Sequence, residues 1–143
     1  MIAFETTRTV RFADCDPAGI VFFPQYLVMA NTLVEQWFDE ALRIPYAQLI
    51  GERRMGLPTV RLEADFSAVS RHGEHLTQRL HVEKLGRSSL ILRHEYFGGA
   101  ELRLRIRQVL VCTSLASHRP QALPDDVRAA VEPLLEKPRV ALP

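Results

Sequence analysis

The segment from Pro24 to Arg43 carries a long amphipathic pattern. Its apolar residues recur at steps of three and four, which is the spacing of a helix with one buried face. These residues are Tyr26, Leu27, Ala30, Leu33, Val34, Trp37, Phe38, Ala41 and Leu42. Pro24 suits the first turn of a helix, because an amide at that position would have no intrahelical acceptor and because proline already has a helical φ. The pattern predicts one long helix that ends at Ile44-Pro45, followed by a short helical turn from Tyr46 to Glu52.

Most of the remaining chain has strand patterns that are bounded by turn residues. A first strand is expected over Glu5 to Phe12, before the turn residues of the segment DCDPAG. Four further strands are expected at Thr59 to Ser70, Leu76 to Leu85, Ser89 to Phe97 and Glu101 to Leu115. The turns between them contain glycine, and consecutive strands at this spacing favour an antiparallel meander. A shorter helix is expected after Leu123-Pro124.

The order of these elements is one strand, one long helix and four strands. The simplest burial gives an α+β protein with the hotdog fold, in which a five-stranded antiparallel sheet wraps around one long central helix, with a short C-terminal helix. A chain of 143 residues has room for one core, so residues 1–143 are expected to form a single domain. Exposed sheet edges favour pairing with a second copy, and we therefore expect a homodimer or homotetramer.

Composition and charge argue against several classes of function. The formal net charge of +1 gives no general basic surface of the kind that non-specific nucleic-acid binding needs. Cys15 and Cys112 form no CxxC pair, and His72 and His75 alone are too few ligands for a metal, so no metal is expected. The chain starts without a signal-peptide pattern and has no run of about 18 apolar residues. We expect a cytoplasmic protein with no nucleic-acid or membrane partner.

The segment from Phe12 to Tyr26, FADCDPAGIVFFPQY, places a carboxylate just before the predicted helix. Asp16 precedes a proline, which favours an extended backbone. Gly19 can adopt the backbone angles of a sharp reversal and lets a ligand approach closely. Free amides and the positive dipole end at a helix start suit a carbonyl oxygen that gains negative charge during attack. The segment therefore combines a carboxylate with a candidate oxyanion site.

The same segment resembles the signature of the 4-hydroxybenzoyl-CoA thioesterase family, a family of hotdog-fold acyl-CoA thioesterases. It contains an Asp-Pro-Ala-Gly turn, an apolar quartet, a proline at the helix start and a tyrosine two residues later. The resemblance implies hydrolysis of an acyl-CoA thioester, with coenzyme A as part of the substrate and no separate cofactor. It also implies that Asp16 is the catalytic carboxylate and that the Phe23 amide polarises the carbonyl. Pro24 has no amide proton and cannot donate a hydrogen bond. The amides of Gln25 and Tyr26 also lie at this helix start and are the alternative donors.

Asp16 has more than one possible role. A thiolate leaves without full protonation, so one carboxylate can suffice, either by attacking the thioester directly or by activating a water. The structural alternative is an Asx turn, the commoner role of an Asp-Pro pair in a loop. Asp14 is expected to be structural or to support a neighbouring catalytic group, and Cys15 is expected to be a packing residue. Glu35 has polar neighbours typical of a solvated face and is the weaker catalytic candidate.

Substrate contacts are expected from Gly19, Tyr26, Asn31 and Thr59. Asn31 lies in line with the apolar side of the helix, where the 4-hydroxybenzoyl-CoA enzyme that the chain resembles has an aspartate beside the aromatic acyl group. This departure argues against specificity for a 4-hydroxybenzoyl group. Thr59 follows Gly-Leu-Pro and is the candidate substrate contact among the residues of the predicted strands. An aryl-CoA is the first expected substrate and a short acyl-CoA the second.

Coenzyme A carries phosphates, and a strand turn offers a cation and a hydroxyl that could meet them. Arg87 and Ser88 occupy this turn, and the resemblance implies that they contact the pantetheine-phosphate end. Arg119 similarly resembles a family arginine that contacts the nucleotide.

Three further arginines alternate with aliphatic residues along the last predicted strand. They are Arg103, Arg105 and Arg107. Alternation places them on one face, and a solvated strand face is the default expectation. A basic stripe for coenzyme A or a subunit contact is the alternative.

Two other functions fit parts of the pattern. A non-catalytic acyl-CoA binding module on the same fold would keep the pocket, but the intact Asp16 loop argues against it. Hotdog dehydratases use a histidine with a carboxylate on the helix, and residues Gln25 to Arg43 contain no histidine. Thioester hydrolysis is therefore the preferred function.

Overall fold

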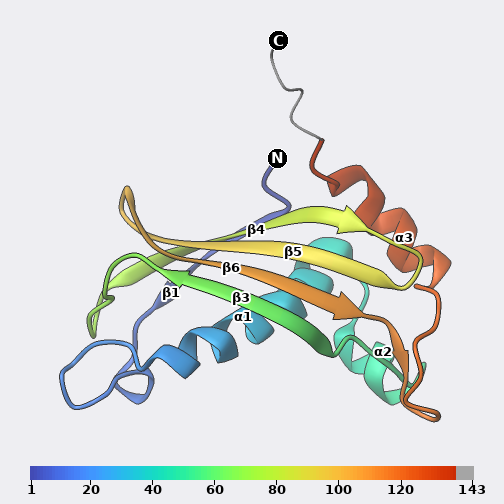
Figure 1. Cartoon of the computed structure of the whole chain (residues 1–143), viewed down its shortest axis with the longest axis horizontal. Coiled ribbons are helices and arrows are strands. Elements are labelled where there is room, and N and C mark those ends of the chain that lie inside the picture. Colours follow the sequence, from blue (N-terminus) through green and yellow to red (C-terminus); the bar gives the residue numbers. More distant parts are fainter. Residues whose placement is uncertain (138–143) are drawn as a thin grey trace.

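A five-stranded antiparallel sheet dominates the computed structural model, which describes residues 1–137. Its strands are β1 (Phe4–Thr9), β3 (Thr59–Phe66), β4 (His75–Leu85), β5 (Ser89–Gly98) and β6 (Glu101–Val111). Their spatial order is β1-β4-β5-β6-β3, and Figure 1 shows the sheet curving over the long helix α1. A separate small ladder joins β2 (Met55–Gly56) to β7 (Thr113–Ser114). The last six residues of the predicted single domain lie outside the described residues.

The helix α1 (Phe23–Trp37) runs into a π-helical turn, η2 (Phe38–Leu42), which confirms the predicted long helix. It starts one residue before Pro24, and Pro24 lies in the first turn, where no intrahelical hydrogen bond is lost. The buried residues of this helix are Tyr26, Met29, Ala30, Leu33, Val34, Trp37 and Phe38.

The two short helices that the sequence predicts are also present. They are α2 (Tyr46–Gly51) and α3 (Asp125–Val131), the latter followed by a 3-10 turn, η3 (Glu132–Leu134). Within residues 1–137, no helix combines the length and the apolar character needed to cross a bilayer.

The predicted meander of four strands is wrong for β3. β4, β5 and β6 form consecutive hairpins, whereas β3 pairs with β6 at one edge and β1 pairs with β4 at the other. The connection from Phe66 to His75 therefore crosses between two distant strand positions and is not a tight turn. Local turn residues cannot reveal this, because the pairing of β3 depends on contacts with residues about 45 positions later.

Three predicted strand ends also differ from the structure. The strand β3 stops at Phe66 and not at Ser70. The first strand stops at Thr9, and a 3-10 turn, η1 (Phe12–Asp14), occupies the end of the predicted strand. The last predicted strand is interrupted after Val111, where Cys112 separates β6 from β7.

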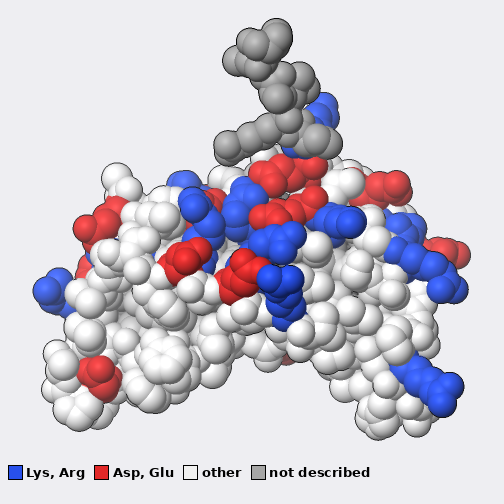
Figure 2. All heavy atoms as spheres, in the orientation of Figure 1, with Lys and Arg blue, Asp and Glu red and all other residues white. Residues whose placement is uncertain are grey.

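The two faces of the sheet differ, as the alternation of side chains in strands requires. The buried apolar residues of the three central strands are Leu76, Leu80, Val82, Leu90, Leu92, Tyr96, Leu104, Ile106 and Leu110. On the other face, Arg105 Nη2 lies 2.9 Å from Glu95 Oε2, and Arg107 Nε lies 2.9 Å from Glu83 Oε2. Figure 2 shows positive and negative side chains interleaved on the visible surface. Arg105 and Arg107 thus lie on a charge-paired outer face.

Arg103 departs from the predicted arginine stripe, because it is buried with only 7% of its surface exposed. The register of β5 and β6 passes from Phe97↔Leu102 to Tyr96↔Leu104, which leaves Arg103 as the extra residue of a β-bulge. A bulge places two residues opposite one and re-aims a side chain. The expectation that all three arginines share a solvated face is therefore wrong for Arg103.

The core also contains a short polar chain that begins at His94, which is fully buried. Its Nε2 lies 2.8 Å from Gln108 Oε1, and Gln108 Nε2 donates to Thr59 Oγ1 at 2.9 Å. His94 Nδ1 has no hydrogen-bond partner among the described residues. Burial lowers the pKa of His94 from 6.5 to about 4, because the charged ring would be unsolvated.

We expect His94 to make the fold sensitive to acid. Its folded-state pKa is depressed, so its neutral form is favoured at neutral pH and stability falls as pH drops from 6.5 to about 4. The full decrease in the free energy of unfolding is on the order of 3 kcal/mol. Urea unfolding at several pH values should show a shallower decline for His94→Gln than for the wild type. Parallel declines in the two proteins would contradict this assignment.

Candidate active site

The loop that follows η1 is a tight turn organised by Asp16. Its Oδ1 accepts a hydrogen bond from the Ala18 amide at 2.8 Å, and its carbonyl oxygen accepts one from Gly19 at 3.0 Å. Gly19 has φ +77, a left-handed conformation that favours glycine. The structure thus contains the Asx turn that was the structural alternative for Asp16. Only Oδ1 is used, and Oδ2 accepts no hydrogen bond from residues 1–137, so the turn role leaves one oxygen available.

Asp14, two residues earlier, is occupied by structural contacts. It is buried, and its carboxylate accepts hydrogen bonds from the Arg11 amide at 2.8 Å and from Arg8 Nη2 at 3.3 Å. Its carbonyl oxygen accepts a hydrogen bond from the Phe22 amide at 2.9 Å. Asp14 therefore ties the start of the loop to the residue that precedes α1, in line with its predicted structural role.

The start of α1 presents a free backbone amide at Phe23. The neighbouring amide of Phe22 is bonded to Asp14, and that of Gln25 is bonded to the Phe22 carbonyl at 2.8 Å. The Phe23 amide has no acceptor within the described part of the chain, and Pro24 has no amide proton. A free N–H at the positive end of a helix favours an oxygen that gains negative charge.

The loop and the helix start form one compact arch. An isolated antiparallel bridge joins Cys15 to Val21, and the Asp16 amide donates to the Ile20 carbonyl at 3.0 Å. These bonds fix Asp16 relative to the chain that enters α1, so the two groups predicted to act together belong to one rigid local unit.

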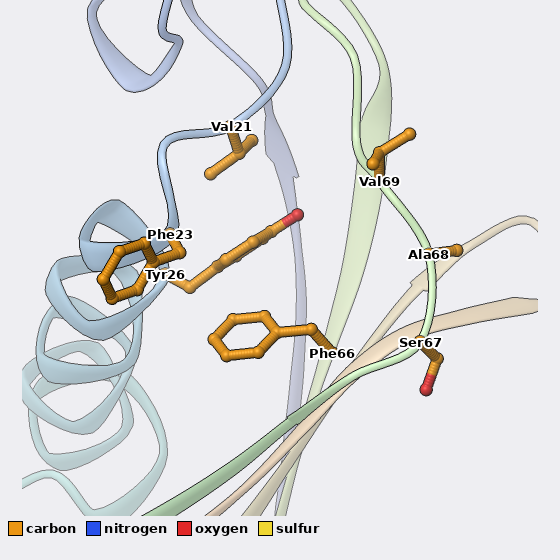
Figure 3. Close-up of a pocket in the computed structure, with 7 residues that line it drawn as sticks. All are labelled: Val21, Phe23, Tyr26, Phe66, Ser67, Ala68 and Val69. Carbon is orange, nitrogen blue, oxygen red and sulfur yellow. The ribbon is translucent and has the colours of Figure 1, made fainter.

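An apolar cavity of about 330 Å³ lies beside this arch (Figure 3). It is lined by Val21, Phe23, Tyr26, Phe66, Ser67, Ala68 and Val69. The Phe66 ring centroid lies 6.2 Å from that of Phe23 and 5.9 Å from that of Tyr26. Phe23 and Phe66 remain 59% and 51% exposed, which makes the mouth of the cavity unusually apolar.

The hydroxyl of Tyr26 extends between Val21 and Val69 in this cavity (Figure 3). Burial raises the pKa of Tyr26 above its usual value, so the phenol stays neutral. Ser67 supplies the other side-chain hydroxyl of the lining. With no charged group in its lining, the cavity suits an apolar or aromatic group.

A second hollow, of about 370 Å³, contains Asp16 itself and is lined by Phe12, Cys15, Asp16, Pro17, Gly19 and His72. The ring centroids of His72 and Phe12 lie 5.9 Å apart, and the His72 amide donates to the Gly19 carbonyl at 3.0 Å. The sequence indicates His72 only as a weak metal ligand and gives no sign of its place beside Asp16. Its position depends on the long connection between β3 and β4.

Cys15 is close to Asp16 but is a poor nucleophile. Burial, and then the negative charges of Asp14 and Asp16, raise the pKa of its thiol, so the thiolate is scarce at neutral pH. Glu35 is exposed on α1, as its polar neighbours predict. Within residues 1–137, no group of three or more potential metal ligands lies together.

Several predicted contact residues lie far from this arch within one chain. Thr59 begins β3 and Phe66 ends it, so they are separated by about 23 Å along the strand. Arg87 and Ser88 follow the last residue of β4, whereas the arch packs near its first residue, roughly 33 Å away. Figure 1 shows the arch and the β4–β5 turn at opposite ends of the sheet.

Arg119 and Asn31 are also separate from the cavity. The Arg119 carbonyl accepts a hydrogen bond from Ser114 in β7, at the same end of the sheet as the β4–β5 turn. Asn31 is exposed on α1, and neither residue lines the two hollows described above. Within a single chain, Asp16 and Gly19 line the second hollow and Phe23 and Tyr26 line the apolar cavity, whereas the other predicted contacts line neither.

The chain is similar to proteins of known family. A family model described as the thioesterase-like superfamily matches residues 10–131. The chain belongs to this superfamily. The 4-hydroxybenzoyl-CoA thioesterase of Pseudomonas sp. (strain CBS-3) is 28% identical over 122 residues, covering 81% of this chain and 86% of that protein. The 1,4-dihydroxy-2-naphthoyl-CoA hydrolase of Synechococcus sp. (strain CC9605) is 32% identical over 129 residues, covering 86% and 85%.

Solved structures agree with this family membership. The crystal structure of a 1,4-dihydroxy-2-naphthoyl-CoA thioesterase from Synechocystis superposes with a TM-score of 0.84 at 27% identity, covering 92% of this chain and 96% of that one. The predicted hotdog fold, the predicted family and the assignment to thioester hydrolases are thereby confirmed.

The two aspartates of the arch should respond differently to the same substitution. Asp14→Asn presents an amide group to donors that need an acceptor, and it should lower the free energy of unfolding by about 1–3 kcal/mol. Asp16→Asn keeps an oxygen for the Ala18 amide and should leave stability nearly unchanged. Urea unfolding of both variants checks this contrast, and equal losses would contradict the assigned roles.

Proposed function

We propose that this chain hydrolyses an aryl-CoA or short acyl-CoA thioester, with Asp16 as its catalytic carboxylate and the Phe23 amide as its oxyanion donor. The observation that carries the proposal is the arch itself. It holds a carboxylate oxygen without a hydrogen bond and an amide without an acceptor in one short segment, beside an apolar cavity. The relatives named above, which act on aromatic acyl-CoA thioesters by name, support the same chemistry.

The proposed reaction needs few groups. The Phe23 amide stabilises the oxygen of the thioester carbonyl as it becomes negative. Asp16 either removes a proton from an attacking water or attacks the carbonyl carbon itself to form a mixed anhydride, which water then hydrolyses. In both routes the carbon–sulfur bond breaks, coenzyme A leaves as a thiolate, and the acyl group leaves as a carboxylic acid. Label found in Asp16 after a single turnover in ¹⁸O-labelled water would identify direct attack, because a water activated by Asp16 places its oxygen only in the product.

The acyl group proposed for this site is apolar and preferably aromatic. Phe23, Tyr26 and Phe66 offer ring faces and edges to a flat substituent. The cavity lining has no carboxylate, and Asn31 is exposed on α1, so a ring hydroxyl finds no charged acceptor from that position. A short aliphatic acyl group is the second candidate, since the same apolar walls would accept it.

We further propose that coenzyme A is bound across a homodimer. The edge strand β3 has mostly exposed side chains and an unpaired edge in one chain, and Val60 is 60% exposed. Antiparallel pairing of two such edges about a two-fold axis reverses the partner sheet. The partner's β4–β5 turn then comes to the end of the joined sheet that holds this chain's Asp16. Such a dimer gives Arg87, Ser88 and Arg119 access to the phosphates of a substrate whose thioester lies at Asp16.

A non-catalytic acyl-CoA binding module remains the alternative function. It has the same cavity and the same dimer, but it releases no thiol. The free oxygen of Asp16 favours the enzyme, because a turn residue that served only its own loop would not need to face a hollow.

Asp16→Asn should lower kcat by about 10²- to 10⁴-fold, because it removes the group that attacks or activates water. KM should change little, since the cavity and the turn are retained. Release of free thiol from a panel of benzoyl-CoA, hydroxybenzoyl-CoA, acetyl-CoA and hexanoyl-CoA measures both constants. Glu35→Gln is the matched control and should retain wild-type rates. Near-normal turnover in Asp16→Asn would refute the assignment, and no release from any substrate by the wild type would favour the binding module.

Mixing two impaired variants tests the shared site. If Asp16 of one chain works with Arg87 of the other, heterodimers of Asp16→Asn and Arg87→Gln contain one intact site and one site with both changes. Activity at low substrate concentration should therefore rise well above that of either variant alone. A mixture no more active than its components would show that both residues act from the same chain or that Arg87 has no role. Val60→Lys should weaken the dimer in sedimentation experiments, whereas Thr7→Lys on the β1 edge should not.

A further inference from the structure

Arg103 is the most completely buried arginine in the described part of the chain, and its guanidinium joins several segments at once. Nη1 donates to the Val69 carbonyl at 2.9 Å and to Glu74 Oε1 at 3.0 Å, while Nη2 donates to Glu74 Oε2 at 2.8 Å. Nε lies 2.8 Å from Glu101 Oε1. The planar fork of arginine can make these contacts together, and a lysine cannot.

The segment held by Arg103, residues 69–74, forms a wall of both hollows. Val69 lines the apolar cavity, and His72 lines the hollow that contains Asp16. On its other side this segment is bonded to the arch: the Val21 amide donates to the Ser70 carbonyl at 2.9 Å, and the His72 amide donates to the Gly19 carbonyl at 3.0 Å. Residues 69–74 therefore connect Arg103 to the loop that carries Asp16.

Glu74 completes the clamp. Its Oε1 also accepts a hydrogen bond from the Arg71 amide at 2.7 Å, so the carboxylate joins Arg103 to the backbone of the same segment. The hydrogen bond from Arg103, followed by that from the Arg71 amide, lowers the pKa of Glu74 from 4.5 to about 2. The pair therefore stays charged at neutral pH.

Gly98 provides the space for this guanidinium. A Cβ atom at Gly98 would lie 2.1 Å from Arg103 Nη2 and 2.4 Å from Arg103 Cζ, which is far inside van der Waals contact. Glycine at this position is therefore explained by the arginine and not by the backbone, because Gly98 has no left-handed φ.

We propose that Arg103 is a positioning residue for the thioesterase reaction. Through Glu74 and the Val69 carbonyl, it holds residues 69–74 against the arch and so keeps Asp16 aligned with the Phe23 amide and with the apolar cavity. This inference rests on the proposed function. Arg103 is buried and Glu74 is partly exposed. Such an ion pair is a weak source of stability, since desolvation offsets much of its attraction, and a role in holding geometry explains why the pair and the glycine occur together.

Two variants displace the clamp in different ways. Arg103→Lys keeps the charge and loses the fork, whereas Gly98→Ala keeps Arg103 and obstructs its guanidinium. The matched controls are Arg105→Lys, which alters an arginine on the outer face of the same strand, and Gly51→Ala, where an added Cβ has no atom within 4 Å. Hydrogen exchange measured by mass spectrometry, thermal unfolding and steady-state kinetics on the best acyl-CoA of the panel are applied to all four variants.

For Arg103→Lys and Gly98→Ala, exchange of the Val21 and His72 amides should become about tenfold faster, while the β4 and β5 amides keep their protection. Because misalignment of reacting groups mainly affects the chemical step, kcat should fall on the order of tenfold to a hundredfold with KM within about threefold of the wild type. Both controls should resemble the wild type in all three measurements.

Unchanged exchange and kcat in both clamp variants would overturn the proposal. A uniform loss of protection across the chain would also overturn it, because Arg103 would then serve stability alone. If the wild type hydrolyses no acyl-CoA, the proposed function fails, and the exchange experiment still decides whether Arg103 holds residues 69–74 in place.

Discussion

Burial of the apolar side of α1 against the concave face of the sheet is the interaction on which the rest of the structure depends. Each apolar side chain removed from water contributes roughly 1.5–3 kcal/mol, and α1 buries seven residues if Phe38 is included. This burial fixes the position of the helix start, and hence of the Phe23 amide. The arch before the helix then carries Asp16 to a defined place at one end of the sheet. The geometry of the arch is therefore a consequence of how the helix packs against the sheet.

In the proposed function, Asp16 has both a structural and a catalytic role. Asp16 shapes its own turn with Oδ1, and this bond restricts the side chain to one orientation. A carboxylate that is already oriented loses less freedom when it engages a substrate. Asp14 cannot play the same part, because Arg8 and Arg11 occupy both of its oxygens. These two neighbours therefore differ in whether a carboxylate oxygen is free.

The sequence predicts the features that depend on the local spacing of apolar residues and on short sequence motifs. The spacing of apolar residues identified α1, and the resemblance around Asp16 identified the arch and the family. Prediction fails where contacts between distant residues decide the outcome. The position of β3 beside β6, the bulge that turns Arg103 inward and the approach of His72 to Asp16 all depend on pairing between segments far apart in the chain. The predicted contacts at Thr59 and Arg87 lie at the opposite end of one chain, and they join the site only in the dimer that we propose.

A structure with a bound substrate analogue tests the central claim most directly. In an aryl-CoA ketone, a methylene group lies between the carbonyl carbon and the sulfur, so the compound keeps the carbonyl and cannot be hydrolysed as a thioester. In a crystal of the wild type with this ketone, the account predicts the carbonyl oxygen about 3 Å from the Phe23 amide nitrogen. The free Asp16 oxygen should face the carbonyl carbon, and the aryl ring should lie beside Tyr26 and Phe66. An analogue bound with its carbonyl away from both Phe23 and Asp16 would contradict the account.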